Sequence, residues 1–402
     1  MSRRVVVTMP GDGIGRVVLP HAVAVLEAAG FDADYVEAPI GWDCWLEQGN
    51  ALPQRTVELL ERHRLGLFGA ITSKAKTQAE AELRPELRRH GLRYTSPIVA
   101  LRQRFDLDVC IRPCRSFPGN PLNFVRRTAS GAIEEPSIDA VVFRQNTEGL
   151  YVGLEWTDPP AAVLDALGSH PRFRPFAGVP PADIAITTRL FTRNACRRIV
   201  HAAYDYALRH GRASVTVCEK PNVLQETSGM LEQVAREVQS SFPAIEHRAV
   251  NIDTQMLVLT KMPETLGVIV AGNEFGDILS DGIAGLVGGL GFVASANLGE
   301  RIAVFEPIHG SAPKYASVDP PIANPIAMIL AAAMLAEYAG DAPRAATIRQ
   351  AVARVVRAGR VRTYDMLRVP GGADVRSSGA ATTGEMAQAV IAELEPLRQV
   401  AD

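Results

Sequence analysis

The chain has 402 residues, enough for two or three domains or for one large unit of two lobes with a cleft. Hydrophobic residues make up 47% and charged residues 21%, unlike a disordered chain, and the net charge of −2 gives no reason to expect nucleic acid or an anionic membrane as a partner. The first residues show no signal peptide, and glycine or proline interrupts the uncharged stretches at 282–299 and 320–336, so neither resembles a membrane-spanning helix. We therefore expect a cytoplasmic protein.

Short β-branched runs alternate with longer amphipathic segments along the chain, which predicts an α/β fold. Strand-like runs lie at 4–10, 65–71, 214–220 and 265–272, and helices are expected at 17–29, 227–239 and 277–287. The proline-rich segment 156–183 has little periodicity, so we expect a long loop or an arm that reaches a partner subunit. The cysteines are scattered and odd in number, which predicts structural thiols rather than disulfides or a zinc site: Cys44, Cys110, Cys114, Cys196 and Cys218.

Two glycine-containing turns are candidates for nucleotide binding. The sequence GDGIG at 11–15 follows a strand, but its third glycine comes one residue too early for the usual dinucleotide fingerprint, so a tight turn with close packing is the favoured interpretation. The sequence HGSAPKY at 309–315 reads as a loop whose amides could surround a nucleotide. Lys314 and Tyr315 could hold a phosphate there by charge and hydroxyl donation.

Charged residues of both signs suggest a site. Asp277 and Asp281 are four residues apart at the expected start of a helix, where they could bind Mg²⁺ or Mn²⁺ or could simply cap the helix. Arg102, Arg112 and Arg144 each lie in apolar sequence, which favours a pocket for a small polyanionic acid, although each alone could form a structural salt bridge.

Two further residues are candidates for proton transfer. Lys220 ends a predicted buried strand and could act as a general base. Tyr151 is the nearest candidate acid in the sequence.

Taken together and in order, the motifs resemble the β-decarboxylating dehydrogenases, a family that includes isocitrate, homoisocitrate and 3-isopropylmalate dehydrogenases. The resemblance spans nearly the whole chain and rests on GDGIG at 11–15, SPIVALR at 96–102, FRQNTEGLY at 143–151, KPNVL at 220–224, NID at 251–253, GDILSD at 276–281 and HGSAPKY at 309–315. It implies the two-lobed isocitrate/isopropylmalate dehydrogenase-like fold. Residues 1–107 and 288–402 would form a large nucleotide-binding domain, 108–148 and 188–287 a small dimerisation and substrate domain, and 149–187 an arm or clasp-like insertion.

The resemblance also implies a role for each matching site residue. Asp277 and Asp281, with Asp253 of the partner subunit, would bind Mg²⁺ or Mn²⁺. Ser96 and the three arginines would bind the substrate. Lys220 of the partner subunit would deprotonate the substrate hydroxyl and Tyr151 would return a proton after CO₂ leaves, so the enzyme would be a homodimer with shared active sites.

The cofactor implied is NADP rather than NAD. Relatives that use NAD usually have Asp after HGSAP, whereas this chain has Lys314, and a lysine attracts the 2′-phosphate that a carboxylate would repel. Tyr364 and Arg368 resemble the pair that completes the phosphate clamp in NADP-dependent isocitrate dehydrogenases. The full expected cofactor set is Thr72, His309, Gly310, Ser311, Ala312, Lys314, Tyr315, Asn324, Tyr364 and Arg368.

The expected reaction is the oxidative decarboxylation of a 3-substituted malate to a 2-oxo acid and CO₂. The SPIVALR motif looks more like that of homoisocitrate dehydrogenases, and a basic segment nearby suggests an acidic substituent, as in isocitrate, homoisocitrate or a phosphonomethylmalate. That segment carries Lys76, Arg84, Arg88, Arg89 and Arg93, which could equally form a solvated helix face. The alternatives are a 3-isopropylmalate dehydrogenase and a non-catalytic regulatory subunit of a mixed oligomer. Because Lys220, Tyr151 and the three aspartates are all retained, the regulatory interpretation is disfavoured.

Overall fold

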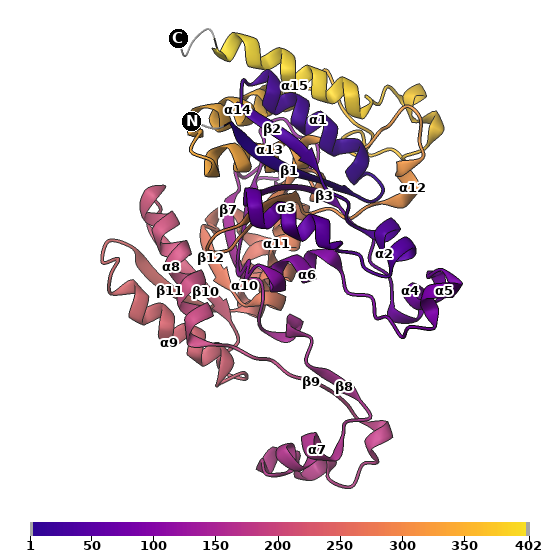
Figure 1. Cartoon of the computed structure of the whole chain (residues 1–402). Helices are drawn as coiled ribbons and strands as arrows, with labels where there is room; N and C mark the ends of the chain where they lie inside the picture. Colours follow the sequence, from indigo (N-terminus) through magenta and orange to yellow (C-terminus); the bar gives the residue numbers. More distant parts are fainter. Residues whose placement is uncertain (1–2, 399–402) are drawn as a thin grey trace.

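The computed structural model describes residues 3–398, which form two lobes around one ten-stranded sheet, with an arm that extends away from them (Figure 1). The strands, in sheet order, are β11 (Glu246–Asn251), β10 (Ser214–Glu219), β12 (Val268–Ala271), β7 (Asp139–Gln145), β4 (Val109–Arg115), β13 (Ala294–Leu298), β14 (Ala303–Pro307), β3 (Leu65–Ala70), β1 (Arg4–Gly11) and β2 (Ala33–Glu37). Neighbouring strands are parallel except β7 with β4, β4 with β13, and β13 with β14. The predicted α/β class is confirmed.

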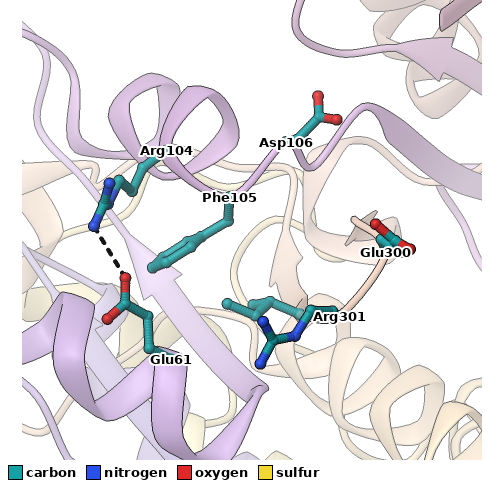
Figure 2. A pocket seen from close by; sticks show the side chains of 7 residues that line it. Glu61, Arg104, Phe105, Asp106, Glu300 and Arg301 are labelled. Carbon is teal, nitrogen blue, oxygen red and sulfur yellow. Dashed lines mark hydrogen bonds and ion pairs between the residues drawn. The ribbon is translucent and has the colours of Figure 1, made fainter. Parts of the chain in front are cut away.

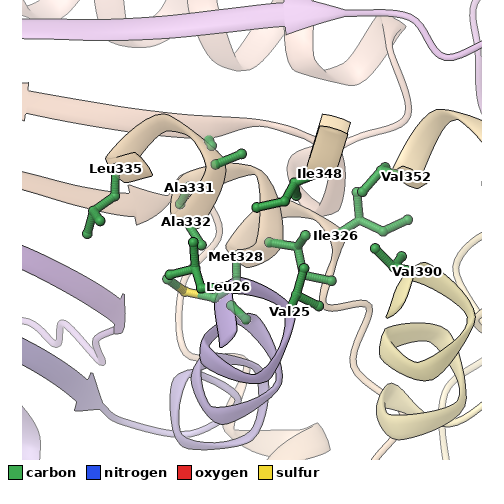
Figure 3. Packing of buried hydrophobic residues seen from close by; sticks show 14 of the residues in the cluster. Val25, Leu26, Ile326, Met328, Ala331, Ala332, Leu335, Ile348, Val352 and Val390 are labelled. Carbon is green, nitrogen blue, oxygen red and sulfur yellow. The ribbon is translucent and has the colours of Figure 1, made fainter. Parts of the chain in front are cut away.

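The larger lobe covers both faces of its part of the sheet, because successive side chains of a strand point to opposite faces. On β1, Val6 joins one apolar cluster while Val7 and Met9 join another. The first cluster includes helices α1 (Gly15–Ala28), α13 (Ile326–Tyr338), α14 (Ala342–Ala358) and α15 (Thr383–Arg398), whose interlocking side chains are seen in Figure 3. The second cluster includes α3 (Gln54–His63) and α6 (Pro97–Arg104).

A smaller apolar cluster lies beside the larger lobe, beyond the end of β3. It packs Trp42 and Trp45 against Ala79 and Leu83. The helices that meet there are α2 (Trp42–Gln48), α4 (Lys76–Glu82) and the short α5 (Pro85–Arg88). This cluster therefore supports the basic segment that the sequence singled out.

The smaller lobe surrounds strands β10, β11 and β12. It contains helices α8 (Arg193–Arg209), α9 (Thr227–Gln239), α10 (Ile252–Lys261) and α11 (Asn273–Leu286). Two apolar clusters fill it, one beneath α8 and α9 and one beneath α10 and α11. Strand β7 contributes to both, because Phe143 points into the first and Val142 into the second. The two helix pairs therefore lie on opposite faces of the sheet.

The proline-rich segment forms the arm. Its strands β8 (Glu155–Thr157) and β9 (Ala185–Thr187) pair antiparallel, and α7 (Ala161–Gly168) lies at its far end (Figure 1). The base of the arm is closed by a hydrogen bond of 2.9 Å from Gly149 N to Leu190 O. The arm's role in dimerisation and the division of the chain into domains stay predictions.

Two further features concern possible membrane-spanning helices and the cysteines. Between residues 3 and 398, none of the helices combines the length and the apolar character needed to cross a membrane. All five cysteines are buried and free, as the scattered spacing predicts.

Candidate active site

Several residues of the expected site follow the carboxyl ends of parallel strands in the sheet. Strands β3 and β14 are parallel, so Thr72 and His309, which follow them, lie at the same edge. Strands β7, β12 and β10 are also parallel, and they are followed by Tyr151, Asn273 and Lys220. Three antiparallel pairings separate these two groups of strands, so their carboxyl ends lie at opposite edges of the sheet, and ligands can bind outside either of them.

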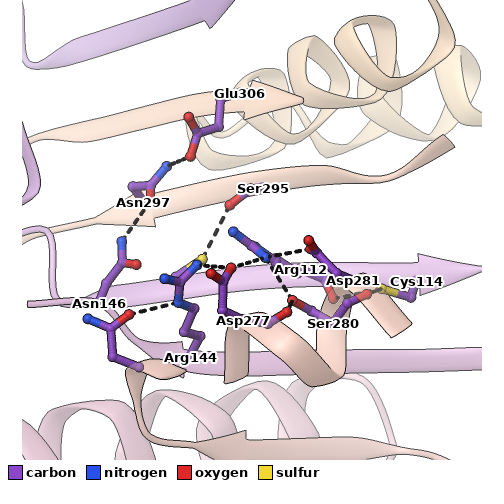
Figure 4. A network of polar contacts seen from close by, with 12 residues as sticks. Arg112, Cys114, Arg144, Asn146, Asp277, Ser280, Asp281, Ser295, Asn297 and Glu306 are labelled. Atoms are coloured by element: carbon purple, nitrogen blue, oxygen red, sulfur yellow. Dashed lines mark hydrogen bonds and ion pairs between the residues drawn. The ribbon is translucent and has the colours of Figure 1, made fainter. Parts of the chain in front are cut away.

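Two arginines from the centre of the sheet meet two aspartates from α11 (Figure 4). Arg112 Nη1 lies 3.0 Å from Asp277 Oδ1 and 3.2 Å from Asp281 Oδ1, and Arg144 donates to the same Asp277 oxygen. Arg112 and Arg144 are 6% and 3% exposed, whereas the Asp281 side chain is 52% exposed. The cluster therefore has a cationic floor and a carboxylate rim that solvent can reach.

Helix α11 begins at Asn273, four residues before the predicted start at Asp277. Asp277 and Asp281 consequently lie beyond the first turn, and the acidic residue of that turn is Glu274. This excludes the capping interpretation of the aspartate pair, because favourable interactions with a helix end fade after one turn. The pair is instead held by the two arginines.

The electrostatics of this cluster favour an anion. Burial, with the nearby guanidiniums of Arg112 and Arg102, lowers the pKa of Arg144 to about 10. Burial likewise raises the pKa of the Asp281 carboxyl above its usual range. Both shifts come mainly from burial, which disfavours the charged forms, and ligands of opposite charge would favour them again.

Arg102 contacts residues other than the aspartates that Arg112 and Arg144 bind. It is 8% exposed, donates from Nε to Asn297 Oδ1 at 3.0 Å, and forms an ion pair of 3.1 Å with Glu306 Oε1. A structural salt bridge, the alternative left open by the sequence, is thus present at Arg102. Ser96, at the amino end of α6, lies 3.4 Å from the hydroxyl of Ser73.

Tyr151 lies on a single 3₁₀ turn, Leu150–Val152, between β7 and the arm. The Arg144 guanidinium carbon is 5.7 Å from the centre of its ring, and the residue is 43% exposed. Burial of the ring and the charge of Asp277 raise the pKa of Tyr151 above its usual value. The phenol therefore carries its proton at neutral pH.

Lys220 and Asp253 form a separate pair. Lys220 Nζ is 2.8 Å from Asp253 Oδ1, at the junction of β10 with the start of α10. Neither side chain hydrogen-bonds or ion-pairs with Asp277, Asp281 or the arginines. Within residues 3–398, no group of three or more His, Cys, Asp or Glu side chains is close enough to hold a metal ion. One chain thus contains two incomplete halves of the predicted site.

The two glycine-containing turns contact each other. Ile14 N donates to Ser311 O at 2.8 Å, and the hydroxyls of Thr72 and Ser311 are 2.7 Å apart. A Cβ on Gly13 would lie 2.1 Å from Ser311 O, at a positive φ of 54°. Close packing therefore explains the second glycine of GDGIG, as the sequence interpretation favoured.

The predicted loop at 309–315 contains a short helix, α12 (Pro313–Ala316), which is a correction to the expected loop. Lys314 and Tyr315 lie on it, with Lys314 Nζ 4.7 Å from the centre of the Tyr315 ring. The rings of Tyr315 and Tyr364 are 5.0 Å apart. Three members of the expected phosphate clamp are thus adjacent.

The other members of the expected cofactor set have different surroundings. Arg368 is exposed and donates to Pro121 O at 2.7 Å, so its guanidinium makes no hydrogen bond with the clamp. Asn324 is buried and donates to Asp365 Oδ2 at 3.0 Å. His309 Nδ1 donates to Gly310 O at 3.0 Å, and its Nε2 is buried without a partner. Ala312 has a positive φ of 37°, which turns the chain into α12.

The basic segment faces solvent. Every one of its cationic residues is exposed: Lys76, Arg84, Arg88, Arg89 and Arg93. Arg84 lies 3.9 Å from Glu47, and Arg88 donates to Leu83 O. The exposure and these contacts favour the interpretation of the basic segment as a solvated helix face over its interpretation as part of a preformed substrate pocket.

Four polar residues near the site were missed. Asp12 is buried and accepts from the backbone N of Trp42 and of Thr72. Glu306 neutralises Arg102, and Asn273 contacts Arg144. Glu219, next to Lys220, is 1% exposed and accepts from Gly272 N and Arg189. Their shared signal is a polar residue at the end of a buried strand.

A surface cavity of about 470 Å³ lies away from this site (Figure 2). Its lining includes Glu61, just before β3, and Ile302, just before β14. It therefore lies at the amino ends of these strands, opposite Thr72 and His309. Its charges are mixed, with Arg104 paired to Glu61 at 3.0 Å.

Known proteins match this chain over nearly its whole length. The sequence profile of the isocitrate/isopropylmalate dehydrogenase family matches residues 5–390. Protein DlpA of Legionella pneumophila is 35% identical over 388 residues, 96% of this chain, although the chain spans only 58% of the length of DlpA. A homoisocitrate dehydrogenase of Methanocaldococcus jannaschii is 36% identical over 86% of this chain and 88% of its own. The crystal structure of an isocitrate dehydrogenase from Methylococcus capsulatus superimposes with a TM-score of 0.79 and 32% identity, covering 97% of this chain and 99% of that one.

Proposed function

The chain belongs to the isocitrate/isopropylmalate dehydrogenase family, whose members are β-decarboxylating dehydrogenases, and we propose that it oxidatively decarboxylates a 3-substituted malate with NADP. The observation that carries the proposal is the convergence of Arg112 and Arg144 on Asp277 beside Tyr151. This arrangement combines a carboxylate-binding floor, a metal-binding rim and a protonated acid.

The arginines bind and orient the acid. Arg112 and Arg144 are buried, so their guanidiniums are poorly solvated and interact strongly with the carboxylates of a substrate. Arg102, whose charge Glu306 already balances, lies near enough to Arg144 to help lower its pKa, and it presents its remaining donors to the acid. Ser96 directly precedes α6, the helix that carries Arg102.

The carboxylates suit Mg²⁺ or Mn²⁺, because these ions prefer oxygen ligands and retain water. Asp277 and Asp281 supply two carboxylates one helical turn apart, and Asp253 of the partner subunit supplies the third. When bound, the cation would supply Lewis acidity for the substrate oxygen at C2, and the dinucleotide would supply a hydride acceptor for C2.

Protons are handled by two side chains. Lys220 of the partner subunit takes the proton of the C2 hydroxyl at Nζ as the hydride leaves. The bond from C3 to its carboxylate then breaks, CO₂ leaves, and the electron pair stays on the substrate as an enolate. The Tyr151 hydroxyl delivers a proton to C3, which its raised pKa allows at neutral pH.

The preference for NADP over NAD rests on Lys314, Tyr315 and Tyr364, which lie side by side next to the Ser311 turn. A cation and two hydroxyls suit a 2′-phosphate. Arg368 lies on the following turn and joins this set by releasing the Pro121 carbonyl.

The proposal of a homodimer is supported by the fact that Lys220 and Asp253 pair with each other and not with Asp277. Helices α10 and α11, which carry Asp253 and Asp277, also expose large apolar side chains: Leu257 is 60% exposed and Ile278 52%. An apolar face of this kind on two adjacent helices is typical of an interface. A second copy packed there would bring the two halves of a site together.

An acidic substituent, as in isocitrate, homoisocitrate or a phosphonomethylmalate, is the preferred substrate class because SPIVALR resembles homoisocitrate dehydrogenases. 3-Isopropylmalate is the second candidate, and the solvent exposure of Arg88, Arg89 and Arg93 favours it. Replacing these arginines singly by Ala discriminates between the two. KM for the acid rises if they bind the substituent, and unchanged kinetics in all three variants would remove that role.

The test of the reaction is NADPH formation with Mg²⁺ across isocitrate, homoisocitrate, 3-isopropylmalate and phosphonomethylmalate, with NAD in parallel. We expect turnover of an acidic member of the series, and no turnover without the divalent cation. Absence of turnover with every acid and both cofactors would contradict the proposal that the chain is an active enzyme, and it would favour a regulatory subunit.

A further inference from the structure

Asn273 lies where three parts of the candidate site meet. It is the first residue of α11, follows β12 directly and is 2% exposed. Its Oδ1 accepts from Arg144 Nε at 2.9 Å, and its Nδ2 donates to Glu148 O at 2.9 Å. Glu148 begins the segment 148–152 that carries Tyr151. One side chain thus connects the arginine, the tyrosine segment and the aspartate helix.

Only one orientation of the amide satisfies both contacts. Arg144 Nε can only donate, so it requires the amide oxygen, and the Glu148 carbonyl can only accept, so it requires the amide nitrogen. Neither aspartate nor alanine can replace both interactions. The chemistry of this position therefore calls for asparagine or a close amide equivalent.

The backbone beneath Asn273 is itself fixed. The preceding Gly272 N donates to Glu219 Oε1 at 2.7 Å, and Glu219 is held in turn by Arg189 at 2.8 Å and by Ser228 Oγ at 2.6 Å. A Cβ on Gly149, in the tyrosine segment, would lie 3.3 Å from Asn273 Cβ. Because Glu219 holds the residue directly before α11, Asn273 can hold its two partners in place.

We propose that Asn273 is a positioning residue that sets the guanidinium of Arg144 and the Tyr151 segment relative to each other. The proposal rests on the proposed function, since it gives the two partners the roles of carboxylate binder and proton donor. Asn273 itself touches no reacting atom. Its two hydrogen bonds have separable effects, on acid binding through Arg144 and on proton delivery through Tyr151.

Two variants test these effects. Asn273→Asp keeps an acceptor for Arg144 but faces the Glu148 carbonyl with a second acceptor, so it frees the Tyr151 segment, and its added charge competes with the acid for Arg144. We expect a raised KM, a kcat lowered by about 100-fold, and a larger solvent deuterium isotope effect on kcat because proton delivery becomes limiting. Asn273→Ala removes both bonds, so KM for the acid also rises.

The matched control is Asn123→Ala. Asn123 is also a buried asparagine, 5% exposed, that donates to Phe117 O at 2.8 Å and to Glu135, and it contacts none of the proposed site residues. We expect it to lower the unfolding temperature while KM and the isotope effect stay as in the wild type. If Asn273 served stability alone, its variants would behave in the same way, and that result would overturn the proposal.

A readout independent of activity accompanies the kinetics. Deuterium exchange of backbone amides in the peptide containing residues 148–152 should become faster in Asn273→Asp and stay unchanged in Asn123→Ala. Unchanged exchange in Asn273→Asp would also overturn the positioning role, whether or not the wild type turns over any acid. A wild type without turnover but with faster exchange in the variant would instead contradict the proposed function alone.

Discussion

Tyr151 meets Arg144 through the face of its ring, which leaves the hydroxyl free. The guanidinium carbon is 5.7 Å from the ring centre, so Tyr151→Phe keeps this cation–π contact and removes only the transferable proton. We expect kcat to fall by about 100-fold or more with KM nearly unchanged, because a positioned general acid contributes on that scale. Steady-state kinetics with the preferred acid measures both. A KM that rises while kcat is retained would identify Tyr151 as a binding residue instead.

Asp108 is the buried carboxyl with a testable effect on stability. Burial, opposed in part by Arg198, raises its pKa from 3.8 to about 6. The folded chain therefore binds a proton that the unfolded chain has lost, so this contribution to stability is full at low pH and is lost as pH rises through about 6. The contribution is on the order of 3 kcal/mol, the value of about two pKa units.

Asp108→Asn removes this titration. The free energy of unfolding of the wild type minus that of the variant should fall between about pH 4 and pH 7, as urea titrations at several pH values would show. A difference that increases with pH would mean that the Arg198 pair outweighs burial.

The sequence predicted some residues of the candidate site but not others. The spacing of Asp277 and Asp281 and the apolar setting of Arg112 and Arg144 suggested a charged pocket, and the structure brings these residues together. Asn273 lies just before the GDILSD motif and, beyond being a polar residue after a buried strand, gave no sign of its role, because its partners are a backbone carbonyl and an arginine far away in the sequence. Hydrogen bonds of this kind depend on the register of β7 and β12, which no local pattern specifies.

At the scale of elements, the strand and helix alternation was predictable because hydrophobic periodicity records which face is buried. Boundaries were less so. Helix α11 begins four residues before its predicted start, and Glu219 of another strand accepts from the backbone N of Gly272, the residue just before the helix. Helix α12 is too short for periodicity to detect and begins after the positive φ of Ala312. Both deviations lie at the site, where tertiary contacts override local preference.

Helix α12 carries a prediction about cofactor choice. Lys314→Asp replaces the cation of the proposed phosphate clamp by a carboxylate, which repels a 2′-phosphate and can accept from ribose hydroxyls. We expect kcat/KM for NADP to fall by about 10- to 100-fold while kcat/KM for NAD is kept or rises. Arg62→Asp, an exposed charge reversal on α3, is the control and should change neither value. Equal losses with both cofactors would place Lys314 outside the clamp.

At the scale of the whole molecule, the net charge of −2 conceals a segregated distribution. Buried arginines gather in the middle of the sheet, while the carboxylates of α11 and the Lys220 and Asp253 pair lie near its surface. The sequence resemblance implied that the second pair serves a partner. Only a quaternary arrangement can test this, because within one chain the two halves have no contact.

Mixing two inactive variants tests the shared site. Lys220→Met and Tyr151→Phe homodimers would each lack one group in both sites, so each should be nearly inactive. In a mixed dimer the Tyr151 half of the first chain meets the intact Lys220 of the second, which restores one site, while the other site carries both substitutions. Random assembly makes about half of the dimers mixed, so co-expression should recover about a quarter of wild-type activity.

Mixing Lys220→Met with a Lys220→Met, Tyr151→Phe double variant is the control and should recover nothing. If co-expressed single variants stay inactive while native mass spectrometry shows mixed dimers, Lys220 and Tyr151 must act within one chain, and the proposed division of the site between subunits would be wrong.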